Sequence, residues 1–470
     1  MKNQVLAVLT VIIILTALSI NAGKASPLQS NLTLSFSGVV QQTSTGTYAY
    51  IVSVSGSNYQ MKNGATQQVI YQNTNAVKVI SFVIGNFTPG HQSAYFTAGT
   101  YNLTASLEIT NKDNGYLVFE NGAKLFIVNG MNKSAIFIHD GCDNWLIDGI
   151  EIDGNGAYQT VGSWSPPDGI AIYNSCNNIT VDHAYIHGSR MYGFVAWSDV
   201  TNCGIKNSKV TNCGWNCIQL GNDVMAISTE TELYAINNEC AYCSDVGITT
   251  YGIGNLIQGN YIHDVYGTTG YINSQWGIGV EGGHGHTITG NTLVNCPRAM
   301  SIEQTDGVGS NTITDNTITT CGFGIVVVSP NNTLKNNTIS NFDMYGWSQQ
   351  AIVIEGSYGG ANNNKVLSNT ISSTNTIAHA IHINSADDTQ FTDNKISVPR
   401  VGISWYAIQV SDSSRTQISR NTISGFMGII IDDATCQSNT ITNNDFTKCN
   451  SGTGAIANYG TGTIITGNLT

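Results

Sequence analysis

A short hydrophobic motif recurs along most of the chain: Gly or Ala, an apolar residue, any residue, and a second apolar residue. Its copies begin at Gly169, Gly193, Gly247, Gly277, Gly324, Ala351, Ala380, Ala407 and Gly428. Alternation of this kind predicts a short β-strand with one buried face and one variable face. One such repeat cannot bury its own apolar face, so the copies must stack.

A second repeated feature is an Asn placed two residues before an apolar β-former. It recurs every 21 to 32 residues, at Asn238, Asn260, Asn291, Asn316, Asn337, Asn369, Asn394, Asn421, Asn444 and Asn468. Successive coils lie about 4.8 Å apart, so equivalent side chains contact one another. We therefore predict an all-β parallel β-helix, a solenoid in which these Asn residues form a hydrogen-bonded ladder.

The N-terminal region lacks the repeat. Residues 5–20 are apolar and are followed by small residues, which predicts a signal peptide over 1–25 or an N-terminal anchor. Residues 73–86 have a polar start, an apolar face and a Gly stop, which predicts a helix that caps the solenoid. We assign 26–66 to an N-terminal β segment, 67–134 to the cap and first coils, and 135–470 to the repeats.

Composition narrows the choice of partners. The net charge is −12 with only 18 Lys and Arg, which argues against nucleic acid and against an anionic membrane surface. A polysaccharide is the expected partner, and we expect a secreted or cell-surface monomer. Eight of the 11 Cys residues recur at two equivalent turn positions, which favours buried thiol stacks; inter-coil disulfides are the alternative.

Two segments carry a resemblance to a known superfamily. They are Phe96-Thr-Ala-Gly-Thr-Tyr101 after the predicted helix, and Ile150-Glu-Ile-Asp-Gly-Asn-Gly156 before the long run of coils. Together with the repeats, they make residues 67 to 470 resemble the pectate lyase and polygalacturonase superfamily of right-handed parallel β-helices. The resemblance implies that fold and an activity on polysaccharides.

One motif is similar to polygalacturonases in particular. Gly283-His284-Gly285 resembles their Gly-His-Gly, and Asp168 matches their first carboxylate. The pattern then departs, because Ser189-Arg190 stands where a paired Asp is expected and no Arg-Ile-Lys segment is present.

The residue that closes each predicted strand points away from the core. This column reads Tyr173, Trp197, Gly221, Tyr251, Glu281, Glu303, Val328, Glu355, Asn384, Ser411 and Asp432. Its aromatic residues suit stacking on sugar rings. Glu281 and Glu303 fall on adjacent coils, where they serve either as a general acid with an ionised partner or as ligands of a calcium ion.

The turns before these strands supply the other candidate residues. For catalysis they are Asp168, Arg190, Asp245, His263, His284 and Arg298, beside Glu281 and Glu303; for substrate binding they are Tyr192 and Tyr266, beside Tyr173, Trp197 and Tyr251. An Arg suits a uronate carboxylate, and a His or Tyr suits proton exchange. No cofactor is required beyond the calcium alternative.

Three functions fit the sequence. The first is a secreted carbohydrate-active enzyme, a lyase, hydrolase or epimerase, that works in a groove along the strand face. The second is a non-catalytic glycan-binding module, and the third is a structural surface protein.

Overall fold

The structure is a computed structural model that describes residues 48–89, 92–162, 166–222, 229–265, 275–303, 309–343, 350–357, 360–374, 379–398, 406–425, 428–449 and 455–470. All of them lie within one compact unit, residues 40–470. The predicted signal peptide or anchor and the candidate Tyr266 lie outside these ranges. Within them, no helix has the length and apolarity needed to span a bilayer.

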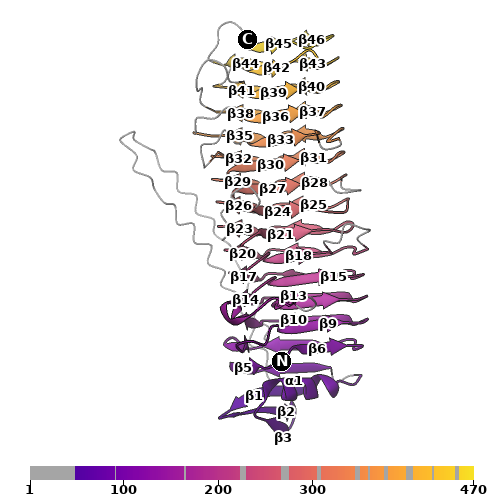
Figure 1. The fold of residues 1–470 in the computed structure, drawn as a ribbon, viewed down its shortest axis with the longest axis vertical. Helices are drawn as coiled ribbons and strands as arrows, with labels where there is room; N and C mark the ends of the chain where they lie inside the picture. The colour runs from indigo at the N-terminus through magenta and orange to yellow at the C-terminus, as the bar shows by residue number, and fades with distance from the viewer. Residues whose placement is uncertain are drawn as a thin grey trace, which may run out of the picture. The chain divides into compact units, whose positions relative to one another are not determined.

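The described residues form a parallel β-helix, as the repeats predict. Each coil contributes one strand to each of three parallel sheets, which we call sheets I, II and III in the order in which the chain visits them. Figure 1 shows the strands of successive coils stacked in sequence order, from β5 and β6 to β43, β44 and β45. The Gly/Ala-apolar-x-apolar motif forms sheet III, and the Asn ladder marks the turn from sheet I to sheet II.

The strand bounds are as follows. Sheet I contains β4 (Ser93–Phe96), β7 (Tyr116–Phe119), β10 (Asp143–Asp148), β13 (Asn177–Asp182), β16 (Gly204–Lys206), β19 (Tyr234–Ile236), β22 (Leu256–Gln258), β25 (Thr287–Thr289), β28 (Thr312–Thr314), β31 (Thr333–Lys335), β34 (Lys365–Leu367), β37 (Gln390–Thr392), β40 (Gln417–Ser419), β43 (Thr440–Thr442) and β46 (Ile464–Thr466). Sheet II contains β5 (Gly99–Leu103), β8 (Ala123–Ile127), β11 (Glu151–Asp153), β14 (Tyr185–His187), β17 (Lys209–Thr211), β20 (Glu239–Ala241), β23 (Tyr261–His263), β26 (Thr292–Val294), β29 (Thr317–Thr319), β32 (Thr338–Ser340), β35 (Thr370–Ser372), β38 (Lys395–Ser397), β41 (Thr422–Ser424) and β44 (Asp445–Lys448). Sheet III contains β6 (Leu107–Thr110), β9 (Ile136–His139), β12 (Ile170–Tyr173), β15 (Phe194–Trp197), β18 (Ile218–Leu220), β21 (Val246–Thr250), β24 (Trp276–Val280), β27 (Arg298–Ile302), β30 (Phe323–Val327), β33 (Ile352–Glu355), β36 (Ile381–Asn384), β39 (Ile408–Ser411), β42 (Ile429–Ile431) and β45 (Ile456–Asn458).

A short helix covers the first coils, in agreement with the prediction. Helix α1 (Ala76–Gly85) begins after Asn75, whose side chain accepts a hydrogen bond from the Lys78 amide. Its buried face packs into the same hydrophobic core that runs through the coils. The antiparallel strands β1 (Tyr50–Ser55), β2 (Asn58–Asn63) and β3 (Val69–Asn73) precede it, and β1 also pairs in parallel with β4. The apolar end of the stack is thereby removed from water.

The Asn ladder forms as predicted. The main-chain amide and Nδ2 of Asn291 donate to Asn316 Oδ1 at 2.9 and 3.0 Å, and Asn316 donates in the same way to Asn337. The bonds continue in this direction from Asn238 to Asn468. Each ladder Asn follows a residue in the left-handed region, such as Asp315 with a φ of 57°. Short polar side chains and Gly tolerate this conformation best, which explains their place in the repeat.

A second ladder, which the sequence reading did not identify, lies at the turn from sheet III to sheet I. The Asn311 amide donates to Asn332 Oδ1 at 3.0 Å, and the Asn332 amide donates to Asn364 Oδ1 at 2.8 Å. At one position of this ladder His286 replaces Asn, and its Nδ1 lies 3.2 Å from the Asn255 amide. Burial lowers the pKa of His286 to about 4, so the ring accepts this bond in its neutral form.

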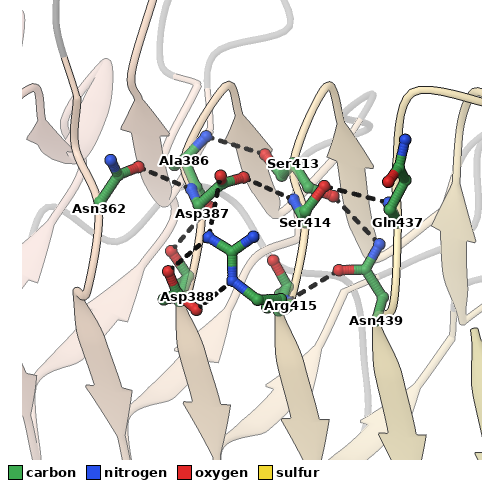
Figure 2. A network of polar contacts seen from close by, with 11 residues as sticks. Asn362, Ala386, Asp387, Asp388, Ser413, Ser414, Arg415, Gln437 and Asn439 are labelled. Atoms are coloured by element: carbon green, nitrogen blue, oxygen red, sulfur yellow. Dashed lines mark hydrogen bonds and ion pairs between the residues drawn. The ribbon is translucent and has the colours of Figure 1, made fainter.

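The same turn carries an ion-pair network on later coils (Figure 2). Arg415 Nε lies 2.7 Å from Asp388 Oδ1, and Arg415 Nη2 lies 3.1 Å from Asp387 Oδ2. The Ser414 amide donates to the Asp387 carboxylate on the neighbouring coil at 2.7 Å. These contacts join adjacent coils at the surface, where the ladder joins them inside.

All eleven thiols are free, and ten of them are buried. Cys142, Cys176 and Cys203 stack on successive coils, and Cys296 and Cys321 do so further along. The thiols therefore serve as small core side chains, as the sequence favoured, and the alternative of inter-coil disulfides is not seen.

Candidate active site on sheet III

Each strand of sheet III presents three outward positions, which we call entry, middle and closing. Across β21, β24, β27 and β30 the register aligns them in columns. The entry column is Val246, Trp276, Arg298 and Phe323; the middle column is Thr249, Gly279, Ser301 and Val326; the closing column is Tyr251, Glu281, Glu303 and Val328. Figure 1 shows these four strands in the central coils.

Glu281 is held at the closing position by two hydroxyl groups. Thr249 Oγ1 donates to one carboxylate oxygen at 2.8 Å, and Tyr251 Oη donates to the other at 2.5 Å. Burial raises the pKa of Glu281, the two hydroxyl groups lower it in part, and the charges of Asp245 and Glu303 raise it further. The net shift is upward, which favours a protonated carboxyl group.

Glu303 occupies the same column one coil later but has a different partner. Arg298 Nη1 lies 3.6 Å from Glu303 Oε1, and Ser301 donates a short hydrogen bond to the same oxygen. Arg298 Nη1 also donates to Ser301 Oγ at 3.2 Å. The guanidinium and the Ser301 hydroxyl thus contact the same Glu303 oxygen.

Arg298 is fixed by the two aromatic rings beside it in the entry column. Its guanidinium carbon lies 5.8 Å from the centroid of Trp276 and 5.6 Å from that of Phe323. Burial lowers the pKa of Arg298, and the charge of Glu303 acts in the opposite direction. Two cation–π contacts on a desolvated guanidinium limit its movement.

Gly279 leaves room for the Trp276 indole, because it has no side chain. A Cβ at Gly279 would lie 2.7 Å from Trp276 Cε3 and 3.2 Å from Glu281 Oε1. The ring therefore lies over the strand beside the Glu281 carboxylate, and only Gly fits beneath it.

A third carboxylate, Asp245, lies at the turn before β21. Burial raises its pKa, and a hydrogen bond from the Trp215 indole lowers it in part. Trp215 is 45% exposed. We call the group of Asp245, Thr249, Tyr251, Glu281, Arg298, Ser301 and Glu303 the carboxylate site.

Five of the residues expected to act together lie in this site: Asp245, Tyr251, Glu281, Arg298 and Glu303.

Four other catalytic candidates lie elsewhere. Asp168 is fully buried at an earlier coil, with strands β15, β18 and β21 between its strand and that of Glu281. Arg190 is exposed on the turn before β15, and His284 is exposed on the turn after β24. His263 lies on sheet II, between Glu239 and Asp264. The structure does not bring these four to the carboxylate site.

The aromatic candidates form their own cluster on the outward face of β12 and β15. Tyr173 and Trp197 stack at 5.3 Å, and Trp197 meets Tyr192 edge to face at 5.7 Å. Tyr192 is only 4% exposed, so its ring is not open for stacking on a sugar. Tyr173 and Trp197 are half-buried and keep part of their surface exposed.

The sequence reading missed Thr249, Ser301 and Trp276. It used only the closing column, although the middle and entry columns also face outward. The middle column is polar or Gly over the coils that carry the acids, and it is apolar at Val195 and Val326 on either side. This local change from apolar to polar residues could have revealed the site from the sequence.

The two acids fit a calcium ion poorly. Arg298 and Ser301 already contact the Glu303 oxygen that faces the site, and two hydroxyl donors occupy Glu281. Within the described ranges, no cluster of three or more His, Cys, Asp and Glu side chains has the geometry to hold a metal ion.

Two family models match parts of the chain. Residues 265–407 match the model described as "Periplasmic copper-binding protein (NosD)", and residues 379–470 match the "Right handed beta helix region". No curated protein matches the sequence. In the described parts of residues 265–407, no three His, Cys, Asp or Glu side chains are grouped so that they could hold a metal ion.

Many solved structures share the fold. The Mannuronan C-5 epimerase AlgE6 A-module of Azotobacter vinelandii is 15% identical, with a TM-score of 0.50 over 83% of this chain and 94% of that one. The Agl-KA catalytic domain is 15% identical, with a TM-score of 0.50 over 72% of this chain and 65% of that one. At these identities the likeness concerns the fold alone. Its three stacked parallel sheets make the chain a parallel β-helix protein, and residues 379–470 match the model of the right-handed β-helix region.

Proposed function

We propose that the carboxylate site hydrolyses a glycosidic bond in a neutral polysaccharide. One observation carries this proposal: two Glu residues occupy adjacent places in one outward column, and burial raises the pKa of Glu281 while Arg298 pairs with Glu303. Carboxyl pairs whose environments separate their pKa values are typical of general acid catalysis beside an ionised partner.

In the proposed reaction, Glu281 donates its proton to the oxygen of the scissile bond. The Glu303 carboxylate attacks the anomeric carbon as the leaving sugar departs. Water then hydrolyses the glycosyl ester while Glu281, now ionised, takes up its proton. The backbones of adjacent coils are about 4.8 Å apart, which allows two side chains of one column to approach the carboxyl separation of about 5–5.5 Å found in retaining enzymes.

The charges of the site favour a neutral substrate. Three acids, Asp245, Glu281 and Glu303, face one basic residue, and Arg298 is already paired with Glu303. A uronate carboxylate would have to compete with Glu303 for this guanidinium. Elimination or epimerisation of a uronan is therefore less well supported than hydrolysis.

We also propose that the protein acts outside the cytoplasm. The apolar run over residues 5–20 and the family model named for a periplasmic protein both support export. A polysaccharide substrate is most accessible there.

A non-catalytic glycan-binding role is the second candidate. The stacked Tyr173 and Trp197, together with the exposed Trp215, offer apolar surface on the same sheet face. Aromatic side chains of this kind bind sugar rings without any need for acids.

The test is incubation of the protein with neutral glycans and uronans, while new reducing ends and the absorbance of unsaturated products are recorded together. We expect reducing ends to appear on a neutral glycan without the absorbance. Glu281→Gln and Glu303→Gln should each lower the rate by about 100-fold or more.

The matched control is Glu355→Gln. Glu355 lies in the same closing column, and hydrogen bonds from Ser357 and Asn384 outweigh its burial and lower its pKa, so turnover should be unchanged. Turnover that survives both site variants would refute the catalytic assignment, and unsaturated products would identify a lyase instead.

A further inference from the structure

A hollow lies on sheet I, whereas the carboxylate site lies on sheet III. It is an open groove of about 410 Å³ over β7, β10, β13 and β16 of sheet I. Its volume falls within the range of about 300–1,000 Å³ that is usual for small-molecule sites. Its lining includes Tyr116, Leu146, Asn178, Thr180, Asp182 and Lys206.

The groove is built by aromatic rings that lie over Gly residues. A Cβ at Gly204 would lie 2.5 Å from Tyr234 Cδ2, so the Tyr234 ring lies flat on that strand. Its hydroxyl reaches Thr180 Oγ1 at 2.6 Å. Trp145 lies over Gly115 in the same way, and its indole nitrogen donates to the Lys112 carbonyl. These contacts fix the floor around the half-buried Leu146.

One edge of the groove is a row of exposed amides. Asn144 Nδ2 donates to Asn114 Oδ1 at 3.1 Å, Asn178 donates to Asn144 at 2.7 Å, and Asn202 donates to Asn178 at 3.2 Å. Each of these three bonds uses one N–H of an Nδ2 group, which has two. The row thus offers regularly spaced donors and acceptors on the solvent side.

The opposite edge is charged but has no excess of positive charge. Asp182 pairs with Lys206 at 3.3 Å and with His183 at 3.2 Å, and His183 also lies 3.0 Å from Asp148. Two carboxylates face one ammonium and one imidazole, so the edge is neutral or negative in either state of His183. An anionic ligand gains nothing from it.

We propose that this groove is an accessory binding site for a neutral oligosaccharide. The apolar floor of Leu146 and the Tyr116 ring suits the CH face of a sugar, and the amide row and the Asp182–Lys206 pair suit its hydroxyls. The site is on sheet I, and it does not depend on hydrolysis at the carboxylate site on sheet III.

The test measures binding of cellohexaose, laminarihexaose, mannohexaose and hexagalacturonate by titration calorimetry. The full chain carries Glu281→Gln so that turnover does not interfere. Leu146→Arg places a long side chain along the floor, and it should reduce the number of sites for a neutral hexaose by one. Leu256→Arg is the matched control, because Leu256 faces outward in the same column on β22, outside the groove. The column already holds Lys365 on β34, so a long basic side chain is compatible with this sheet.

A second pair of variants tests the amide row. Asn178 and Asn202 have φ values of 55° and 51°, which Gly adopts without strain. Only Asn178 lines the groove. Asn178→Gly should weaken binding about fivefold, the effect of one hydrogen bond, while Asn202→Gly should leave it unchanged.

Three outcomes would overturn the proposal. In the first, Leu146→Arg and Leu256→Arg bind the same number of neutral hexaose molecules. In the second, none of the three neutral hexaoses binds. In the third, only hexagalacturonate binds, and Leu146→Arg removes that binding. If Leu146→Arg removes a site while Glu303→Gln has no effect on turnover, the accessory site stands and the hydrolase proposal fails.

Discussion

At the scale of single residues, environment decides what a side chain does more than its type. Glu281 and Glu303 are the same amino acid in the same column. Burial between hydroxyl donors raises the pKa of the first, and a guanidinium pairs with the second. A sequence shows the pair but not this difference, because Thr249, Arg298 and Ser301 come from three separate strand positions.

The first prediction concerns the pH dependence of activity. If Glu281 must be protonated, kcat/KM falls as pH rises through its raised pKa. The Tyr251 hydroxyl lowers that pKa, so Tyr251→Phe should move the alkaline limb to higher pH. Rate profiles of wild type and variant check this, with Tyr173→Phe in the same column as control. A limb that stays in place or moves to lower pH contradicts the assigned acid.

The second prediction concerns Asp168, a buried acid away from the site. It accepts hydrogen bonds from the Tyr192 amide at 3.1 Å and from Ser134 Oγ at 3.2 Å. Burial nevertheless raises the pKa of Asp168 from 3.8 to about 8. The pKa of Asp168 is higher in the folded state than in the unfolded state. The contribution of the protonated Asp168 side chain to the unfolding free energy is therefore complete below pH 3.8 and is lost as the pH rises to about 8.

Asp168→Asn should remove this loss. Between pH 3.8 and about 8, the unfolding free energy of wild type should fall relative to that of the variant. The relative fall should be at most about 1.4 kcal/mol per pH unit. Urea titrations at several pH values measure it, with Asp143→Asn at a partly exposed position as control. Parallel pH profiles for Asp168→Asn and wild type would contradict the buried, protonated state.

At the scale of elements, the strands and the sheet I–II turn were predictable and the site was only partly so. The period-two motif and the Asn column recur, so each copy supports the others. The second ladder escaped notice because its members vary: His286 takes the place of Asn between Asn255 and Asn311. His263 and Glu281 are near in sequence, but a turn separates sheet II from sheet III, and periodicity does not reveal which faces meet.

The third prediction tests the ladder. Asn316→Ala removes the acceptor of two buried donors of Asn291 and the donor to Asn337. Each unsatisfied buried group costs about 1–3 kcal/mol, so we expect a loss of about 2–5 kcal/mol in unfolding free energy. Thr317→Ala, at the exposed next position, should cost much less. Equal losses in chemical denaturation would show that the ladder adds nothing specific.

At the scale of the whole molecule, stability depends on contacts between neighbouring coils. In such arrays each repeat contacts only its neighbours, so an uncovered end is a weak point. Helix α1 covers one apolar end with Val79, Ile80 and Val83 on its buried face. The sequence predicted this helix because its apolar face and polar start are local features.

The fourth prediction concerns this cap. Ile80→Asp places a carboxylate in the core and should release the helix, exposing the first coils and promoting association. Ser81→Asp, at the exposed neighbouring position, should leave the protein unchanged. Size-exclusion chromatography and proteolysis near residue 85 distinguish the two. A stable, unassociated Ile80→Asp protein would show that the cap is dispensable.

The direction of the Asn bonds has a consequence for the electrical character of the stack. From Asn238 to Asn444, each ladder Nδ2 donates one hydrogen bond to the Asn side chain of the next coil and a second to a main-chain carbonyl of the coil before. Each side-chain carbonyl from Asn260 to Asn468 accepts from the coil before. These aligned amides add as vectors, much as the peptide dipoles of a helix do. The column is therefore a dipole along the coil axis, with its positive end at Asn468. An anion should be favoured beside the last coils over the first, even though neither end carries a ladder residue with a formal charge.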